Sequence, residues 1–270
     1  MGFDLTPGVP FFGGPTAGVQ QNTVESLLQT ALVSRLAKRG EPLAILEIGS
    51  WLGFSALTWA HAIERFAGNG SVLCVDPWEP YFSQDDVEKF DPVYRVMNDL
   101  LASGEAYRLF RHNAGCSPLP INHRRGRSAD ILPHLPSESF DLVYIDGSHY
   151  YDAVLFDVTQ AKRLVKDGGI ICGDDLELHL SQVDEGYARA NLASDYALDP
   201  KTGKSFHPGV TLAVGEALGD VGTSGRLWFA QRSGHSFDPF DPRQQQLMIC
   251  PHWTSAMKKH ASRILTPASS

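Results

Sequence analysis

Apolar runs alternate with amphipathic stretches along most of the chain. The runs have the pattern of strands buried on both faces of a sheet. Between them, apolar residues recur at helical spacing. The predicted strands cover 43–48, 71–76, 140–145 and 168–172. The predicted helices cover 23–38, 53–66, 92–101, 128–135 and 151–166. This alternation predicts an α/β fold with a doubly wound, mostly parallel sheet and right-handed crossovers.

Two parts of the chain depart from the alternation. In 107–127 a short strand is expected either at 107–110 or around Ile121.

The later part of the chain has its own turn signals. The glycine pair at 168–169 is expected to stop the preceding helix. After a helical segment near 185–193, the apolar runs 209–215 and 226–231 are separated by a glycine-rich turn. We expect these two runs to be strands that pair as an antiparallel hairpin at the sheet edge.

The pattern divides the chain into an arm and helix over 1–40, a central domain over 41–232 and a tail over 233–270. The first 20 residues are rich in proline and glycine and lack periodicity, which predicts an irregular arm. The helix over 23–38 is expected to be amphipathic, with Asn22 or Thr23 as its cap and Gly40 as its stop. The tail has two Asp-Pro turns and a predicted helix over 253–265.

Composition narrows the class of protein. A chain of 270 residues with 43% hydrophobic and 20% charged residues can bury the core of one large soluble domain. The formal net charge of −8 argues against a nucleic-acid or anionic-membrane partner, because phosphate binding needs a clustered positive field. The basic run 123–127 is the exception, and it fits either a solvated loop or a phosphate clamp.

The cysteines and the N-terminus indicate the compartment. Four cysteines lie far apart without a C-x-x-C pair, which favours free thiols in a reducing compartment. The N-terminus lacks the pattern of a signal peptide, and no apolar run approaches the ~18 residues of a membrane span. We therefore expect a cytoplasmic protein.

Three acids stand at the ends of two consecutive predicted strands. The run 142–145 ends in Asp146, followed by a turn glycine and His149, and the run 168–172 is followed by Asp174 and Asp175. Carboxylate oxygens at one sheet edge suggest a hard cation such as Mg²⁺. Neighbouring strand residues point to opposite faces, so Asp174 and Asp175 can share an ion only if the strand ends at Gly173. The alternative is that each acid caps a helix or fixes a turn.

The turn after the first strand has ligand-binding character. Glycines at 49 and 53 allow backbone N–H groups and a helix N-terminus to approach a ligand closely. Their G-x-x-x-G spacing does not match the G-x-G-x-x-G of dinucleotide sites, and no phosphate-loop lysine follows, which disfavours NAD and ATP. Asp76 ends the second strand, where an acid can bind the hydroxyls of a ribose or cap a helix.

These motifs, in their order and spacing, resemble the class I S-adenosylmethionine-dependent methyltransferases. The resemblance covers roughly residues 40–232 and is closest to metal-dependent O-methyltransferases of the catechol, caffeoyl-coenzyme A and macrolide-sugar types. It implies S-adenosylmethionine and Mg²⁺, or another divalent cation, as cofactors. The motifs that carry it are Leu46–Ser55, Val75–Asp76, Ile145–Asp146 and Asp174–Asp175.

The resemblance also implies roles for individual residues. The metal ligands would be Asp146, Asp174 and Asp175, and the catalytic residues His149 and Asp146. The expected cofactor contacts are Glu47, Gly49, Ser50, Gly53, Ser55, Asp76, Trp78, Ser128 and Asp146. His179, Trp78, Tyr81 and Phe82 are candidate pocket walls or core residues.

Two departures from the catechol type shift the expected acceptor. Catechol-type enzymes have Asp-Asn where this chain has Asp174-Asp175, and they use a lysine near the position of His149. The D-x-x-H spacing from Asp146 to His149 resembles a sugar methyltransferase whose histidine is proposed as the base. We therefore expect a Mg²⁺-dependent O-methyltransferase that acts on a small hydroxylated molecule, such as a sugar of a natural product.

Alternatives remain at this point. In a metal-free methyltransferase the three acids would only orient the substrate, and a non-catalytic protein could use the same motifs to bind the cofactor. An oxidoreductase is disfavoured by the glycine spacing. The N-terminal arm and helix leave a homo-oligomer open.

Overall fold

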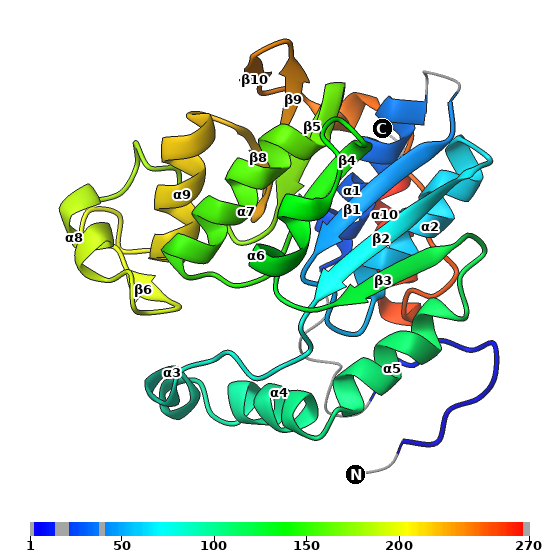
Figure 1. The fold of residues 1–270 in the computed structure, drawn as a ribbon, viewed down its shortest axis with the longest axis horizontal. Coiled ribbons are helices and arrows are strands. Elements are labelled where there is room, and N and C mark those ends of the chain that lie inside the picture. Colours follow the sequence, from blue (N-terminus) through cyan, green and yellow to red (C-terminus); the bar gives the residue numbers. More distant parts are fainter. Residues whose placement is uncertain (1–2, 14–21, 38–40, 267–270) are drawn as a thin grey trace.

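A computed structural model describes residues 3–13, 22–37 and 41–266, arranged around one central sheet (Figure 1). Five of its strands run parallel, in the order β5-β4-β1-β2-β3. The expected α/β fold with a mostly parallel sheet is confirmed. The parallel strands are β1 (Leu43–Ile48), β2 (Gly70–Asp76), β3 (Ile121–Arg125), β4 (Phe140–Ile145) and β5 (Val165–Gly173).

Helices cover both faces of the sheet, because alternate residues of each strand are apolar on opposite sides. In β1, Leu43 and Ile45 pack with one group of helices, and Leu46 and Ile48 pack with the other. The first group contains α1 (Thr23–Ala37), α2 (Phe54–Phe66), α4 (Val93–Ala102) and α5 (Glu105–Ala114). The second contains α6 (Ser128–Ile131), the 3₁₀ helix η2 (Leu132–His134), α7 (Tyr151–Leu164) and α9 (Pro208–Leu218).

The antiparallel edge differs from the expected hairpin. β9 (Leu227–Ser233) runs antiparallel beside β5, but its hairpin partners are β8 (Gly222–Ser224) and β10 (Ser236–Asp238). The predicted strand over 209–215 is wrong, because these residues lie in α9. A short apolar run fits a buried strand or a buried helix equally well. Here Pro208 occupies the first helical turn, where its fixed φ favours a helix.

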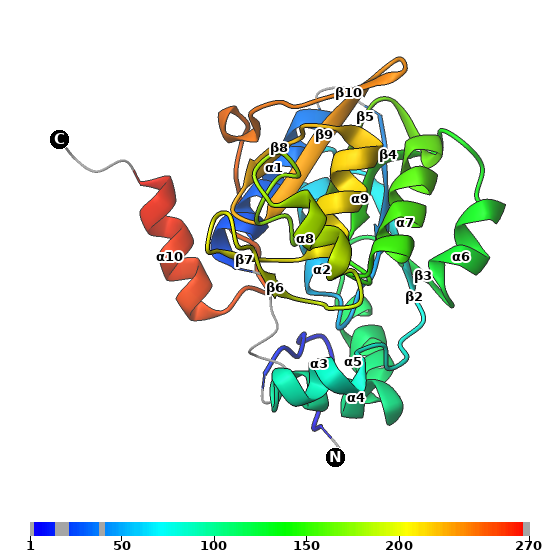
Figure 2. The same cartoon turned by 90° about the vertical axis from the view of Figure 1, so that its left-hand side faces the viewer.

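Of two further expectations, one is confirmed in part and one is corrected. Residues 107–110 lie in α5, so the expected short strand is the one around Ile121, which is β3. The glycine pair at 168–169 does not stop a helix, because α7 ends at Leu164 and β5 begins at the next residue. The loop after β2 contains a short helix, α3 (Gln84–Lys89), capped by the Ser83 hydroxyl. Together, α3, α4 and α5 lie at one end of the molecule (Figures 1 and 2), and α4 and α5 add side chains to the core on the α2 side of the sheet.

The first helix is buried rather than amphipathic. α1 packs against α2 on one side and against the tail elements η3 (Pro242–Gln244) and α10 (Ser255–Leu265) on another, so even Gln29 and Ser26 are buried. Asn22 is its cap, since the Asn22 side chain accepts the backbone N–H of Glu25 at 2.9 Å. The expected end at Lys38 and Gly40 lies outside the described residues, as does 14–20 of the expected arm.

Two smaller regions complete the fold. Residues 3–13 are irregular, as expected, and the rings of Phe3, Phe11 and Phe12 pack on the core beside α5 and α2. Beyond β5, α8 (Glu185–Ala190) and a two-stranded sheet of β6 (Ala197–Leu198) and β7 (Ser205–Phe206) stand beside α9 (Figure 2). None of the described helices has the length and hydropathy needed to cross a membrane. The division into arm, domain and tail stays a prediction.

Candidate active site

The turn between β1 and α2 is packed tightly against the ends of two other strands. Gly49 has a φ of +82°, and a Cβ added there would lie 2.0 Å from the backbone oxygen of Asp146 at the end of β4. The Gly49 N–H donates to the carbonyl of Val75 in β2 at 2.9 Å. Only glycine fits both the backbone conformation and the space.

Asp76, at the end of β2, holds this turn through backbone N–H groups. Its Oδ2 accepts from Ser50 at 2.8 Å and from Trp51 at 3.0 Å, and its Oδ1 accepts from Trp78 at 2.6 Å. Burial raises the pKa of Asp76, and these backbone hydrogen bonds oppose the rise. A carboxylate oxygen can accept two hydrogen bonds, so Oδ1, which accepts one, could still accept another from a hydroxyl group of a ligand.

Glu47 lies on the face of β1 that packs against α2, and its side chain is fully buried. The indole Nε1 of Trp59 donates to its Oε2 at 2.9 Å. Burial raises the pKa of Glu47 to about 8, although the hydroxyls of Ser50 and Ser55 lower it. The Glu47 side chain therefore links β1 to α2 and does not line the cavity described next.

A cavity of about 750 Å³ opens beside the ends of β1, β2 and β4. This volume lies in the range typical of small-molecule sites. Four of the predicted cofactor residues line it, namely Gly49, Asp76, Ser128 and Asp146. The other predicted cofactor residues, which do not line it, are Glu47, Ser50, Gly53, Ser55 and Trp78.

The proposed pocket walls divide in the same way. Tyr81 lines the cavity, whereas Phe82 stacks on Tyr94 with ring centroids 3.9 Å apart. Trp78 is fully buried, and its Nε1 donates to the Trp51 carbonyl at 2.7 Å. His179 lies away from the cavity, with Nε2 3.2 Å from the hydroxyl of Thr223. Of these four aromatic positions, only Tyr81 is placed to touch a ligand there.

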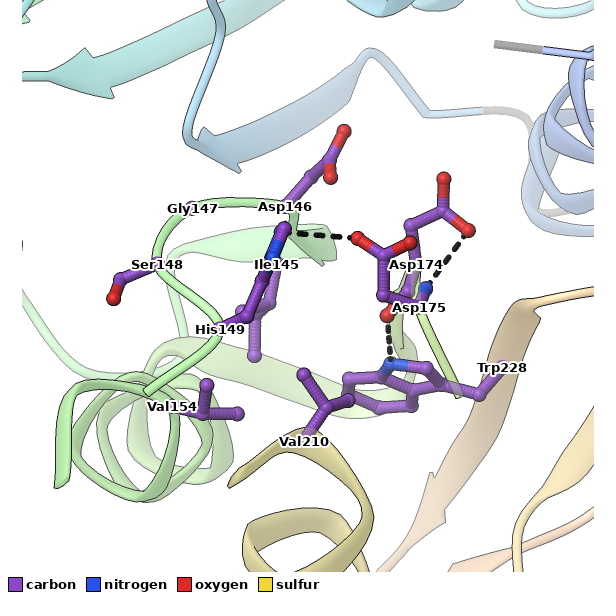
Figure 3. A pocket seen from close by; sticks show the side chains of 10 residues that line it. All are labelled: Ile145, Asp146, Gly147, Ser148, His149, Val154, Asp174, Asp175, Val210 and Trp228. Atoms are coloured by element: carbon purple, nitrogen blue, oxygen red, sulfur yellow. Dashed lines mark hydrogen bonds and ion pairs between the residues drawn. The ribbon is translucent and has the colours of Figure 1, made fainter. Parts of the chain in front are cut away.

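The three predicted metal ligands converge at the ends of β4 and β5 (Figure 3). One oxygen from each of Asp146, Asp174 and Asp175 lies within 4.8 Å of the other two. β5 ends at Gly173, and Asp175 has a positive φ of 66°, so the backbone leaves the strand before both acids. The two neighbouring acids can therefore face the same point, as the sequence required.

The cluster is electrostatically unbalanced. Burial and the nearby charge of Asp175 raise the pKa of Asp146 to about 7. Burial and the nearby charges of Asp175 and Asp146 raise the pKa of Asp174 as well. The pKa of Asp175 is lowered, because His149, His207 and Arg226 outweigh its burial. Crowded acids of this kind favour a cation or a proton between them.

His149 stands beside the cluster, held from both sides. Its Nε2 lies 3.0 Å from Asp175 Oδ2 and its Nδ1 lies 2.8 Å from Asp195 Oδ1. Burial alone would lower the pKa of His149, but the two carboxylates raise it well above its usual value. In the structure as it stands, His149 therefore keeps its proton. Figure 3 shows its ring directed toward Asp175.

The sequence did not point to three residues around this cluster. Arg226 Nη1 lies 2.8 Å from Asp175 Oδ1, and its Nη2 lies 3.5 Å from Asp174 Oδ2. His207 packs edge to face against His149, with centroids 4.5 Å apart, and Asp195 comes from an irregular segment after α8. Arg226 had a usable signal, because an antiparallel strand beside β5 must begin at the carboxyl end of β5. His207 and Asp195 had none.

The fold and site can now be set beside known proteins. A family model described as a methyltransferase domain matches residues 46–176. The O-methyltransferase ankF of Aspergillus thermomutatus is 25% identical over 157 residues, which cover 58% of this chain and 54% of that protein. The chain thus spans about half the length of that relative.

The fold is similar to that of a solved structure, and a second solved structure is a weaker match. The O-methyltransferase NovP has a TM-score of 0.52 at 18% identity, covering 78% of this chain and 80% of its own. CalS11, a TDP-rhamnose 3'-O-methyltransferase, has a TM-score of 0.46 at 16% identity, covering 78% and 80%. The sheet order, the glycine turn beside Asp76 and the matched domain agree with one another. Residues 46–176 therefore match a methyltransferase domain, and the chain shares the fold of the O-methyltransferase NovP.

Proposed function

We propose that the protein transfers a methyl group from S-adenosylmethionine to a hydroxyl of a small molecule, with Mg²⁺ or another divalent cation as a second cofactor. The observation that carries the metal is the convergence of Asp146, Asp174 and Asp175 within 4.8 Å. Three carboxylates suit a hard cation, which keeps further positions for oxygen ligands. Asp146 also lines the large cavity, so the methyl donor and the cation would be neighbours.

Each part of the site would have a separate task. The glycine turn and Asp76 would hold the methyl donor, whose sulfonium supplies an electrophilic methyl group. A bound cation would lower the pKa of the acceptor hydroxyl and fix its orientation. The residues of the chain supply the remaining functions, which are positioning and proton transfer.

His149 would accept the proton of the acceptor hydroxyl. Its Nε2 faces the acid cluster, and Asp195 at 2.8 Å from Nδ1 would keep the other ring nitrogen protonated and the ring oriented. Asp175 at 3.0 Å from Nε2 holds a proton there in the structure. His149 could act as a base only when a bound cation, beside Arg226, weakens the attraction of Asp175 for this proton.

The acceptor is proposed from the sequence pattern alone. The Asp174-Asp175 pair and the spacing from Asp146 to His149 support a sugar or another hydroxylated natural product over a catechol. A role in natural product biosynthesis, a cytoplasmic location and a homo-oligomeric state are proposed on the same sequence grounds.

A metal-free methyltransferase is the second candidate, and one contact favours it. The guanidinium of Arg226 already lies 2.8 Å from Asp175 and 3.5 Å from Asp174, where it offsets part of the negative charge. In that case the acids would orient the acceptor by hydrogen bonds, and no cation would be needed.

Chelator treatment separates the candidates. Calorimetry with S-adenosylhomocysteine should show binding with or without metal. Methyl transfer to a panel of nucleotide sugars, glycosides and catechols, followed by mass spectrometry, should disappear after chelation and return with Mg²⁺. Transfer that persists without any divalent ion would favour the metal-free enzyme. Failure to bind S-adenosylhomocysteine or S-adenosylmethionine would refute both.

A further inference from the structure

A second group of side chains that can ligate a metal lies beside the three acids. One nitrogen each of His149 and His207 and a carboxylate oxygen of Asp175 all lie within 4.8 Å of one another. The Nε2 of His149 lies 3.0 Å from Asp175 Oδ2, and the Nδ1 of His207 lies 4.0 Å from Asp175 Oδ1. These separations bracket the roughly 3.4 Å between two ligand atoms that share one tetrahedral Zn²⁺. The two rings and the carboxylate are therefore close to the arrangement of a metal site.

One buried acid stands behind both imidazole rings. Asp195 is fully buried, and its Oδ1 lies 2.8 Å from His149 Nδ1 while its Oδ2 lies 4.0 Å from His207 Nε2. The hydroxyl of Tyr94 donates to the same Oδ2. A histidine that binds a metal almost always directs its other ring nitrogen toward such a partner, which fixes the ring and its tautomer. Each ring thus has its remaining nitrogen, Nε2 of His149 and Nδ1 of His207, on the side of Asp175.

His207 can give up its present partner without leaving that partner unsatisfied. Its Nδ1 lies 3.1 Å from both carboxylate oxygens of Glu177. Glu177 also accepts the Tyr196 hydroxyl at 2.9 Å and the backbone N–H of His207 at 3.2 Å. These two donors remain when an ion replaces the proton on Nδ1, so the buried carboxylate keeps hydrogen bonds.

Arg226 is the cation that an incoming ion must replace at Asp175. Its Nη1 lies 2.8 Å from Asp175 Oδ1, and its side chain is 39% exposed. The Nε of the same side chain lies 3.6 Å from Glu25. The guanidinium can therefore withdraw from Asp175 toward solvent and keep Glu25 as its ion-pair partner.

The ligand types select a different ion from the one proposed for the three acids. Imidazole nitrogen suits Zn²⁺, Ni²⁺ and Cu²⁺, whereas Mg²⁺ prefers oxygen ligands in an octahedral arrangement. We propose that His149, His207 and Asp175 bind one divalent transition-metal ion of the Zn²⁺ type, with Asp195 as the positioning residue behind both rings. This inference goes beyond the proposed function, because the site needs neither a methyl donor nor an acceptor.

An ion at this site would affect the proposed methyl transfer. Asp175 belongs to both metal sites, which couples their occupation. The ion also takes Nε2 of His149, the nitrogen that would have to be free in a base. If the proposed function holds, Zn²⁺ therefore inhibits the Mg²⁺-dependent reaction.

Titration with Co²⁺ tests the assignment, because Co²⁺ enters Zn²⁺ sites and gives visible absorption bands that report its ligands. The full chain, treated with a chelator, is titrated with Co²⁺ in the presence of excess Mg²⁺. We expect saturation at one Co²⁺ per chain, with the intense visible bands of a low-coordinate ion. Added Zn²⁺ should remove these bands, and calorimetry with Zn²⁺ should give the same stoichiometry.

Variants distinguish this site from the three-acid cluster. His207→Gln removes one imidazole and should lower Co²⁺ affinity by more than the ~10–100-fold expected for Asp195→Asn, which changes only the partner behind the rings. Asp174→Asn changes the neighbouring cluster alone and should leave the bands in place. His134→Gln, which replaces an exposed histidine on η2, is the matched control. Thermal unfolding shows whether each variant is folded, and His149→Gln provides a second ligand variant.

The outcomes are distinct. A wild type that gives no Co²⁺ bands in excess Mg²⁺ overturns the proposal. Bands that persist in folded His207→Gln or His149→Gln, or that vanish in folded Asp174→Asn, also overturn it, because the ion would then lie among the three acids. Each of these results leaves the binding of S-adenosylhomocysteine untouched, so the proposed function is judged separately by its own calorimetry.

Discussion

Two groups of buried acids at the same edge of the sheet are stabilised in opposite ways. At the ends of β1 and β2, Glu47 and Asp76 are held by neutral N–H donors, from an indole and from three backbone amides. At the ends of β4 and β5, Asp174 and Asp175 face each other, Asp146 and the cations Arg226 and His149. Uncharged N–H groups satisfy the carboxylates of the first group. The carboxylates of the second group depend on nearby positive charge.

The difference shows what each end of the site can do. Fixed N–H donors keep Asp76 and the glycine turn in one arrangement, so the proposed cofactor end is preorganised. Burial and mutual repulsion raise the pKa of Asp146 and Asp174, so the other end gains free energy from any cation that neutralises it. A mutation at one end should therefore alter one ligand and spare the other.

The largest expected effect comes from Asp174→Asn. The amide keeps the shape of the side chain but removes one of the proposed anionic metal ligands. If the proposed function holds, methyl transfer with Mg²⁺ should fall by more than the ~10–100-fold that changes around a metal ligand cause. Steady-state rates against Mg²⁺ concentration measure this. Asp167→Asn, which changes an exposed acid in β5, is the control. Unchanged rates, or an equal loss of S-adenosylhomocysteine affinity, would remove the distinction between the two ends.

Asp76→Ala should give the next largest effect. It leaves the N–H groups of Ser50, Trp51 and Trp78 without their acceptor, so the turn loses its arrangement. Hydrogen bonds to a charged group are worth about 1.5–3 kcal/mol, so S-adenosylhomocysteine affinity should drop roughly 10- to 100-fold. Calorimetry with Mg²⁺ alone should show unchanged metal affinity. If metal binding weakened in parallel, the two ends would have to be treated as one unit.

The smallest effect concerns pH and Glu47. Its pKa is raised from 4.5 to about 8 in the fold, so the folded state retains a proton that the unfolded chain releases. The associated stability is complete below pH 4.5 and is lost as the pH rises through 8. Between pH 5.5 and 7.5 this loss should be about 2 kcal/mol.

Glu47→Gln tests this value. The neutral amide should remove that part of the pH dependence in urea unfolding measured at pH 5.5 and 7.5, while other buried acids keep theirs. An identical pH dependence in the two proteins would mean that Glu47 is ionised in the fold.

Most of the fold could be predicted because local pattern and burial agree along the parallel strands. Strands such as 140–145 are apolar on both faces, and this marks a central strand of a parallel sheet. The apolar residues of 209–215 also satisfied that pattern, yet they form α9. A short apolar run carries no period of its own, so its neighbours decide its structure.

The sequence by itself determined which acids would meet. Parallel strands place their carboxyl ends at one edge of the sheet. Once the strands are recognised, this edge must hold the acids that follow them, namely Asp76, Asp146, Asp174 and Asp175. Only the tertiary structure decided what faces them. Arg226, Asp195 and His207 belong to segments that are distant in the sequence. Asp157 lines the cavity from the buried face of α7. Contacts between remote segments depend on packing in three dimensions, which no local pattern of residues records.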